Sequence, residues 1–169
     1  MINTKKDCEN FVSYCKYPPI GQRSFWPMRA QLIHGMDYFE NANSNILCFA
    51  MIETKEAIEN LDEILSVPNL TGVYIGPADM SSSYGLKPKF DVKEDPVFSN
   101  IKLIAKKAKE YDKIAGIHNG TTQYAKEMIT IGYQLVTVSS DFRAMTSYAQ
   151  SVVDEMKQLT SKTKQSDTY

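Results

Sequence analysis

The stretch Leu70-Thr-Gly-Val-Tyr-Ile-Gly-Pro-Ala-Asp-Met-Ser81 decides how the rest of this chain is interpreted. Its first half is rich in β-branched and aromatic residues and predicts a buried strand over 71–75. Gly76 and Pro77 end that strand, because proline cannot continue a sheet ladder and glycine permits a turn that other residues resist. Asp79 therefore follows the carboxyl end of a strand, which is where parallel α/β proteins carry out their chemistry.

A second acidic residue follows the preceding strand. The run Asn45-Ile-Leu-Cys-Phe-Ala-Met-Ile52 predicts a strand over 45–52, and Glu53 comes directly after it. Two carboxylates after successive strands can form the seat of one divalent cation. Each also has a simpler interpretation, because Asp79 can cap the helix that follows it and acidic residues such as Glu53 are common in the first turn of a helix.

Helical periodicity alternates with short apolar runs along the rest of the chain, and no hairpin dipeptide interrupts this order. The pattern predicts an α/β fold of parallel β/α units, with four strands and a strand end at Met1, or about half of an eight-stranded barrel. We expect this domain to cover residues 1–159. The polar stretch 160–169 lacks apolar periodicity and is expected to be a disordered tail. The expected helices begin at Asn3 or Thr4, at Thr54 and at Thr121 or Thr122, and the one from Thr54 includes Leu65. Further helical segments are expected over 38–42, 97–108 and the residues before Leu159, and further strands over 114–117 and 134–138.

Composition excludes several classes of protein. The 169 residues are 43% hydrophobic and carry 19 basic and 20 acidic side chains, so no strong field favours nucleic acid or an anionic membrane. There is no secretory leader and no apolar run near the length of a membrane span, so we expect neither export nor a membrane segment. The three cysteines form no Cys-x-x-Cys pair, and their odd number favours a reduced, cytoplasmic setting.

Five segments, in the same order, resemble the HpcH/HpaI family of metal-dependent aldolases, which act on 2,4-dihydroxyhept-2-ene-1,7-dioate and 2-keto-3-deoxy sugar acids. The resemblance covers about residues 1–160 and implies the C-terminal part of a TIM (β/α)8 barrel, about four to five βα units. It also implies an oligomer, usually a hexamer, in which the last helix packs on a neighbouring subunit. The five segments are Met1-Ile-Asn-Thr4, Tyr17-Pro-Pro-Ile-Gly-Gln-Arg-Ser24, Ala50-Met-Ile-Glu-Thr54, Gly76-Pro-Ala-Asp-Met-Ser81 and Val136-Thr-Val-Ser-Ser-Asp141.

The resemblance implies retro-aldol cleavage of a 4-hydroxy-2-oxo acid into pyruvate and an aldehyde, the reaction of a class II carbon–carbon lyase. A Mg2+, Mn2+ or Co2+ ion would hold the keto and carboxylate oxygens of pyruvate, with Glu53 and Asp79 as its protein ligands. Hard cations of this kind prefer carboxylate oxygens and keep positions open for water and substrate. Backbone amides around Ala78 and Asp79 would receive the substrate carboxylate, which makes Gly76, Pro77, Ala78 and Asp79 the expected substrate-binding residues.

Two departures from the family pattern leave an alternative open. The family's chains begin about four strands earlier, and that part contains the catalytic His, the Asp that orients it and an Arg that steadies the keto oxygen. Met51 stands where the family usually has a Gln, two residues before the metal-binding Glu, and it cannot donate a hydrogen bond. The alternative is a catalytically inactive metal- or pyruvate-binding protein, or a subunit whose partner supplies the first half of the barrel. An unrelated β/α domain is a third interpretation.

Several polar residues are weaker candidates. His118 follows the expected strand 114–117 and is the local candidate for a general base, although it does not match the family's catalytic His and can equally line the pocket or serve the structure. Arg23 follows a Pro-Pro-x-Gly turn and could reach an anionic substrate, or fix its loop through a salt bridge. Ser139 and Asp141 follow the last strand and are candidates for substrate binding or for capping the final helix. His34 is expected at the surface. The sequence identifies neither the aldehyde product nor the metal.

An open half barrel leads to one further expectation. Two unpaired parallel edges and an unclosed interior favour association. We therefore expect a homo-oligomer or a complementing partner rather than a stable free monomer.

Overall fold

The computed structural model describes residues 1–166, and the side chains of residues 1–157. The chain forms two units, of which the first ends at Thr137 and the second begins at Val138. In order, the elements are α1 (Lys5–Cys15), α2 (Met28–His34), α3 (Tyr38–Asn45), β1 (Phe49–Ile52), α4 (Lys55–Glu59), α5 (Leu61–Leu65), β2 (Gly72–Ile75), α6 (Pro77–Ser83), α7 (Val97–Glu110), β3 (Ile114–Asn119), α8 (Thr122–Ile131), β4 (Leu135–Val138) and α9 (Asp141–Ser166).

The four strands form one sheet whose spatial order β1-β2-β3-β4 is the order of the chain. β1 pairs in parallel with β2, with Phe49 opposite Gly72 and Ile52 opposite Ile75. β2 pairs in parallel with β3, with Ile75 opposite Ile117. The expected α/β architecture of parallel β/α units is confirmed.

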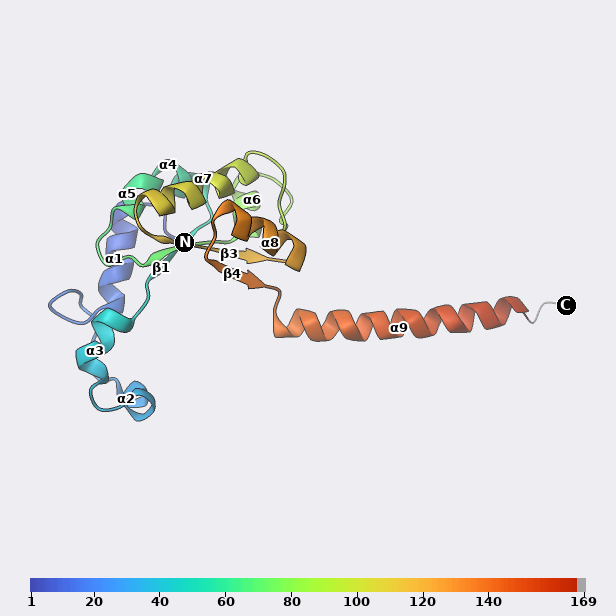
Figure 1. Cartoon of the computed structure of the whole chain (residues 1–169), viewed down its shortest axis with the longest axis horizontal. Helices are drawn as coiled ribbons and strands as arrows, with labels where there is room; N and C mark the ends of the chain where they lie inside the picture. Colours follow the sequence, from blue (N-terminus) through green and yellow to red (C-terminus); the bar gives the residue numbers. More distant parts are fainter. Residues whose placement is uncertain (167–169) are drawn as a thin grey trace. The chain divides into compact units, whose positions relative to one another are not determined.

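The sheet has two different faces because side chains alternate along each strand. One face is packed against helices, and its residues are almost fully buried: Ala50, Ile52, Val73, Ile75, Ala115 and Ile117. Helices α5 and α7 lie over this side of the sheet (Figure 1), and α7 contributes Ile101 and Ile104 to the core. The opposite face is the half-buried face, and it carries the side chains of Phe49, Met51, Tyr74 and His118.

The N-terminal segment is held against the first strand. The Ile2 amide donates to the Met51 carbonyl at 3.1 Å, so residues 1–3 lie beside β1, as expected of a strand end. Thr4 then starts α1 through a reciprocal capping box, in which its side chain accepts from the Asp7 amide and Asp7 accepts from the Thr4 amide.

Two expected elements have different bounds. Strand β1 begins at Phe49, because residues 38–45, expected to be helical only up to Ala42, all belong to α3. The expected helix from Thr54 to Leu65 is divided at Asn60, whose backbone leaves the helical region at φ −101° and ψ 14°. The Asn60 side-chain amide donates to the Asn3 carbonyl at 2.9 Å, so a contact with the N-terminal segment compensates for the break.

The last helix is longer than expected. α9 continues to Ser166, whereas residues 160–169 were expected to be a disordered tail; residues 167–169 of that stretch lie outside the described part of the chain. No proline or glycine occurs within α9, so no residue in it breaks the helix. None of the helices in the described residues is both long enough and apolar enough to cross a bilayer.

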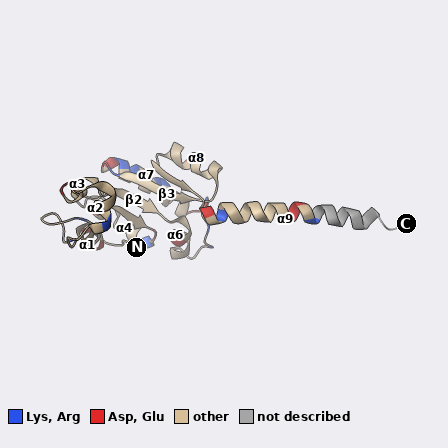
Figure 2. Ribbon diagram, turned by 90° about the horizontal axis from the view of Figure 1, so that it is seen from below, with Lys and Arg blue, Asp and Glu red and all other residues tan. Residues whose placement is uncertain are grey.

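Charged residues of both signs are distributed over the helices of the first unit (Figure 2). Some of them connect neighbouring helices, as in the ion pair between Lys107 of α7 and Asp62 of α5, at 2.9 Å. This pair is exposed at the surface, so we expect it to contribute little to stability.

Candidate metal and substrate site

The sheet register brings the candidate residues level with one another. Ile52, Ile75 and Ile117 are neighbours across the three strands, so the residues that follow them, Glu53 and Gly76, stand level with His118 at the carboxyl end of the sheet. They belong to the same face as Met51 and Tyr74, two residues earlier. The half-buried face of the sheet therefore ends in the row formed by Glu53, Gly76 and His118.

A cavity of about 180 Å3 lies at this edge of the sheet. Gly76 has no side chain, and the Glu53 carboxylate occupies the space where its Cβ atom would lie. The wall is formed by the ends of the strands, the first turn of α6 and the loop before α7, and it consists of Met51, Glu53, Tyr74, Gly76, Pro77, Ala78, Asp79, Phe90 and His118.

Glu53 has the chemical properties of a metal ligand. Its side chain is buried, with only 8% of the residue exposed, and its Oε2 atom has no hydrogen-bond partner among the described residues. Burial, followed by the charge of Asp79, raises the pKa of the Glu53 carboxyl above its usual range. A buried carboxylate without a partner is costly unless an opposite charge compensates for it. A cation at Oε2 would supply that charge.

The two carboxylates approach the same point from different elements. A Cβ atom added to Gly76 would lie 2.3 Å from Glu53 Oε2 and 3.6 Å from Asp79 Oδ2. No group of three or more His, Cys, Asp and Glu side chains gathers around a common point in the described residues. The protein therefore offers two oxygen donors here, and the pair fits a hard divalent cation that completes its coordination with water and substrate.

His118 is held at the cavity by its neighbours on two sides. Its Nδ1 atom lies 3.0 Å from Thr137 Oγ1 on β4, and the same oxygen lies 2.5 Å from the Tyr74 hydroxyl on β2. The Phe90 ring packs edge-to-face against the imidazole, with 5.0 Å between the ring centroids. The sequence analysis did not identify these three neighbours. Strand alternation could have placed Tyr74 on the side of Gly76, but nothing local indicates that Phe90 folds back onto β3.

The family model for HpcH/HpaI aldolase/citrate lyase matches residues 1–147. The chain belongs to this family. It is similar to a hydroxypyruvate/pyruvate aldolase of Rhizorhabdus wittichii, with 35% identity over 94% of this chain and 63% of the relative. It is also similar to a 5-keto-4-deoxy-D-glucarate aldolase of Escherichia coli O157:H7, with 27% identity over 92% of this chain and 61% of the relative. The chain thus spans less than two thirds of the length of these relatives.

Solved structures of the HpcH/HpaI family have the same fold. A family protein from Burkholderia cenocepacia superimposes with a TM-score of 0.83 at 24% identity, over 93% of this chain and 63% of that protein. An aldolase from Desulfitobacterium hafniense gives a TM-score of 0.82 at 22% identity, over 92% of this chain and 61% of that protein. The expected partial TIM-barrel architecture is confirmed by these likenesses.

The remaining candidates lie away from the cavity wall or outside the first unit. Arg23 stacks its guanidinium over the Tyr17 ring at 4.5 Å and lies 3.3 Å from the Tyr38 hydroxyl. It is absent from the residues that line the cavity, and no salt bridge joins it to another described residue. The second unit contains Ser139 and Asp141. Ser139 has a left-handed φ of 61°.

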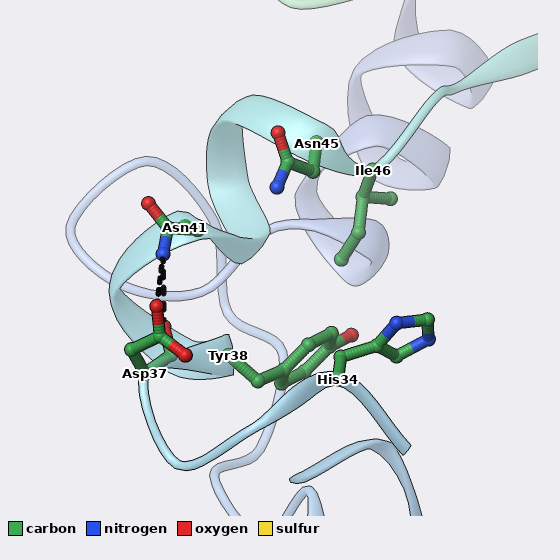
Figure 3. Close-up of a pocket in the computed structure, with 6 residues that line it drawn as sticks. All are labelled: His34, Asp37, Tyr38, Asn41, Asn45 and Ile46. Atoms are coloured by element: carbon green, nitrogen blue, oxygen red, sulfur yellow. Dashed lines mark hydrogen bonds between the residues drawn. The ribbon is translucent and has the colours of Figure 1, made fainter.

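A larger hollow of about 510 Å3 lies beside α2 and α3 and has different chemistry. Figure 3 shows the His34 ring beside the Tyr38 ring and Asp37 joined to Asn41 by a hydrogen bond. Asp37 is the only carboxylate among the described residues that line it, and its side chain already accepts from Asn41. This hollow has no second acidic ligand, so we place the chemistry at the cavity beside Glu53.

Proposed function

We propose that this chain takes part in the metal-dependent cleavage of a 4-hydroxy-2-oxo acid into pyruvate and an aldehyde, the reaction of a carbon–carbon lyase. The observation that carries the proposal is the buried Glu53 carboxylate beside Asp79, whose Oε2 atom has no hydrogen-bond partner in the described part of the chain, in a cavity that His118 also lines. The names of the two relatives, a hydroxypyruvate/pyruvate aldolase and a 5-keto-4-deoxy-D-glucarate aldolase, support the same class of substrate.

Glu53 and Asp79 are the residues that would hold Mg2+, Mn2+ or Co2+. The bound cation supplies positive charge where negative charge develops on the keto oxygen of the substrate. Ala78 and Asp79 line the cavity in the first turn of α6, and their backbone amides are the groups that would receive the carboxylate of the 2-oxo acid. Gly76 and Pro77 line the cavity beside them.

His118 is the proposed base. With Nδ1 bonded to Thr137, the Nε2 nitrogen is the one left to meet a substrate. The imidazole takes the proton of the 4-hydroxyl group while the bond between C3 and C4 breaks, and it then returns a proton to C3, which becomes the methyl group of pyruvate. Arg23 is not part of this proposal, because its guanidinium is stacked on Tyr17.

We also propose that the protein works as a homo-oligomer or with a partner subunit that covers the half-buried face of the sheet. We propose the cytoplasm as its location. The half-buried side chains of that face and the outer edge of β4 support the need for a partner. The three cysteines are all unpaired thiols, as suits a reducing compartment.

The deciding experiment is exchange of the pyruvate methyl protons in D2O, followed by proton NMR with Mg2+ present. The matched histidine variants are His118→Gln and His34→Gln, because the chain has only these two histidines. We expect metal-dependent exchange that is lost in the Glu53→Ala/Asp79→Ala double variant, falls at least tenfold in His118→Gln and is unchanged in His34→Gln. Exchange that persists in the double variant contradicts the assigned metal ligands. Pyruvate-enhanced metal binding without any exchange supports the inactive binding protein instead.

A further inference from the structure

Three neighbouring strands contribute to one hydrogen-bonded chain beside the cavity. Thr137 Oγ1 on β4 lies between the Tyr74 hydroxyl on β2, at 2.5 Å, and His118 Nδ1 on β3, at 3.0 Å. Tyr74 and His118 both line the cavity. Within the described residues the imidazole has no second hydrogen bond. The bond to Thr137 therefore determines which ring nitrogen of His118 carries the proton.

Two arrangements of the hydrogen atoms run in one direction along this chain, and in a third both the Tyr74 hydroxyl and His118 Nδ1–H donate to Thr137 Oγ1, which has two lone pairs. In the first, His118 Nδ1–H donates to Thr137, whose hydroxyl donates to Tyr74, and Nε2 is an acceptor. In the second, Tyr74 donates to Thr137, whose hydroxyl donates to Nδ1, and Nε2 carries the proton. The first and third arrangements leave a free lone pair on His118 Nε2, and the second does not.

Protonation of the imidazole distinguishes the first two arrangements further. When Nε2 of the first arrangement takes up a proton, Nδ1–H and both hydroxyl hydrogens stay where they are. The second arrangement has no lone pair at Nε2, and an imidazolium ring cannot accept at Nδ1, so the Thr137 hydroxyl would have to turn. The first arrangement is therefore organised in advance for accepting a proton.

We propose that Thr137 and Tyr74 are positioning residues that hold His118 as the Nδ1–H tautomer, with Nε2 as the atom that exchanges protons with the substrate. This inference rests on the proposed role of His118. Thr137 acts as the acceptor for Nδ1–H, and the hydrogen bond between Tyr74 and Thr137 holds Oγ1 in place beside the imidazole. The other titratable groups on the cavity wall are Glu53 and Asp79, whose carboxylates gather at Gly76.

The test combines a spectroscopic and a chemical measurement on the same variants. Nitrogen-15 NMR of protein labelled at histidine reports which ring nitrogen of His118 carries the proton, and His34→Gln assigns the signals. Thr137→Val removes the hydroxyl but keeps the shape of the side chain, and Thr137→Ser restores the hydroxyl. Tyr74→Phe removes only the terminal acceptor.

We expect the Nδ1–H tautomer in the unmodified protein and in Thr137→Ser, and a shift toward Nε2–H in Thr137→Val. Exchange of the pyruvate methyl protons should fall at least tenfold in Thr137→Val, about threefold in Tyr74→Phe and less than threefold in Thr137→Ser. A tenfold loss of rate corresponds to about 1.4 kcal/mol of activation free energy. The concentration of pyruvate that gives half-maximal exchange should stay within twofold, because neither hydroxyl is assigned to binding.

An Nε2–H tautomer in the unmodified protein overturns the proposal, and so does a Thr137→Val variant that changes the tautomer but exchanges protons at the original rate. Absence of exchange in every variant contradicts the proposed function, whereas the NMR measurement still decides whether Thr137 positions the ring. If Thr137→Val fails to fold, the tautomer and exchange rate of Tyr74→Phe decide the same question.

Discussion

Replacing Gly76 with alanine tests the candidate metal site directly. Gly76 has φ −98° and ψ 93°, a backbone conformation that alanine adopts without strain. The added Cβ would lie 2.3 Å from Glu53 Oε2, whereas non-bonded heavy atoms settle about 3.5 Å apart, so the carboxylate must retreat by about 1 Å. The atom that moves is the end of a flexible side chain, and the cost therefore falls on the site rather than on the fold.

We expect Gly76→Ala to bind Mn2+ about 10- to 100-fold more weakly, a loss of about 1.4–2.7 kcal/mol of binding free energy. The same substitution should leave the free energy of unfolding in metal-free buffer unchanged, or raise it by about 0.4–1 kcal/mol, because alanine restricts the unfolded chain. Titration calorimetry measures the affinity, and urea unfolding measures the stability. Opposite signs in the two measurements identify a local effect on the ligands.

Gly120→Ala is the matched control. It lies at the same end of the sheet, and its added Cβ would be 3.4 Å from both carboxylate oxygens of Asp91, which is an ordinary contact. Its Mn2+ affinity should stay within twofold of that of the unmodified protein. If Gly76→Ala also binds Mn2+ within twofold, the point where Glu53 and Asp79 converge is not the metal site, and the argument from the unpartnered carboxylate fails.

Three further substitutions test the electrostatics and the packing. The pKa of Glu53 is raised in the fold by burial and by a neighbouring charge, so its ionised form destabilises the folded protein. In metal-free buffer Glu53→Gln should therefore raise the free energy of urea unfolding at pH 7, and this gain should fade as the pH falls through the raised pKa. Tyr133→Phe removes the buried hydrogen bond from the tyrosine hydroxyl to the Ile101 carbonyl and should lower the free energy of unfolding by about 1 kcal/mol, measured by urea at neutral pH. Thr4→Ala removes the N-cap of α1 and should cost about 1 kcal/mol, with faster amide hydrogen exchange in the first turn of that helix; an unchanged exchange rate there contradicts the capping role.

Local patterns predicted most of the fold because the signals that start and stop elements are themselves local. Thr54 and Thr121 accept hydrogen bonds from the first turns of α4 and α8, as their positions before amphipathic runs predict. Gly132 ends α8 with a left-handed φ of 120°, the conformation for which glycine is favoured. The carboxylates could be placed for the same reason, since Glu53 directly follows β1 and Asp79 lies in the first turn of the helix that follows β2.

The features that sequence could not predict depend on residues far apart in the chain. Lys16 is almost fully buried, and its ammonium group donates to the carbonyls of Asn43 and Ile46 at 2.7 and 2.6 Å, which satisfies the end of α3. A lysine at the C-cap of a helix gives no indication of this. The hydrogen bonds of Thr137 with His118 and Tyr74 likewise require the register of three strands, which periodicity within any one strand does not determine.

The agreement between strand order and chain order has a consequence for the way this protein is synthesised. Each strand that follows β1 finds its pairing edge already synthesised, because its neighbour in the sheet precedes it in the chain. No later strand has to be inserted between the two. Every helix between two strands shortens the search for that edge, since contacts between nearby segments form before contacts between distant ones. Assembly can therefore proceed one β/α unit at a time, from the first strand toward the last, during translation.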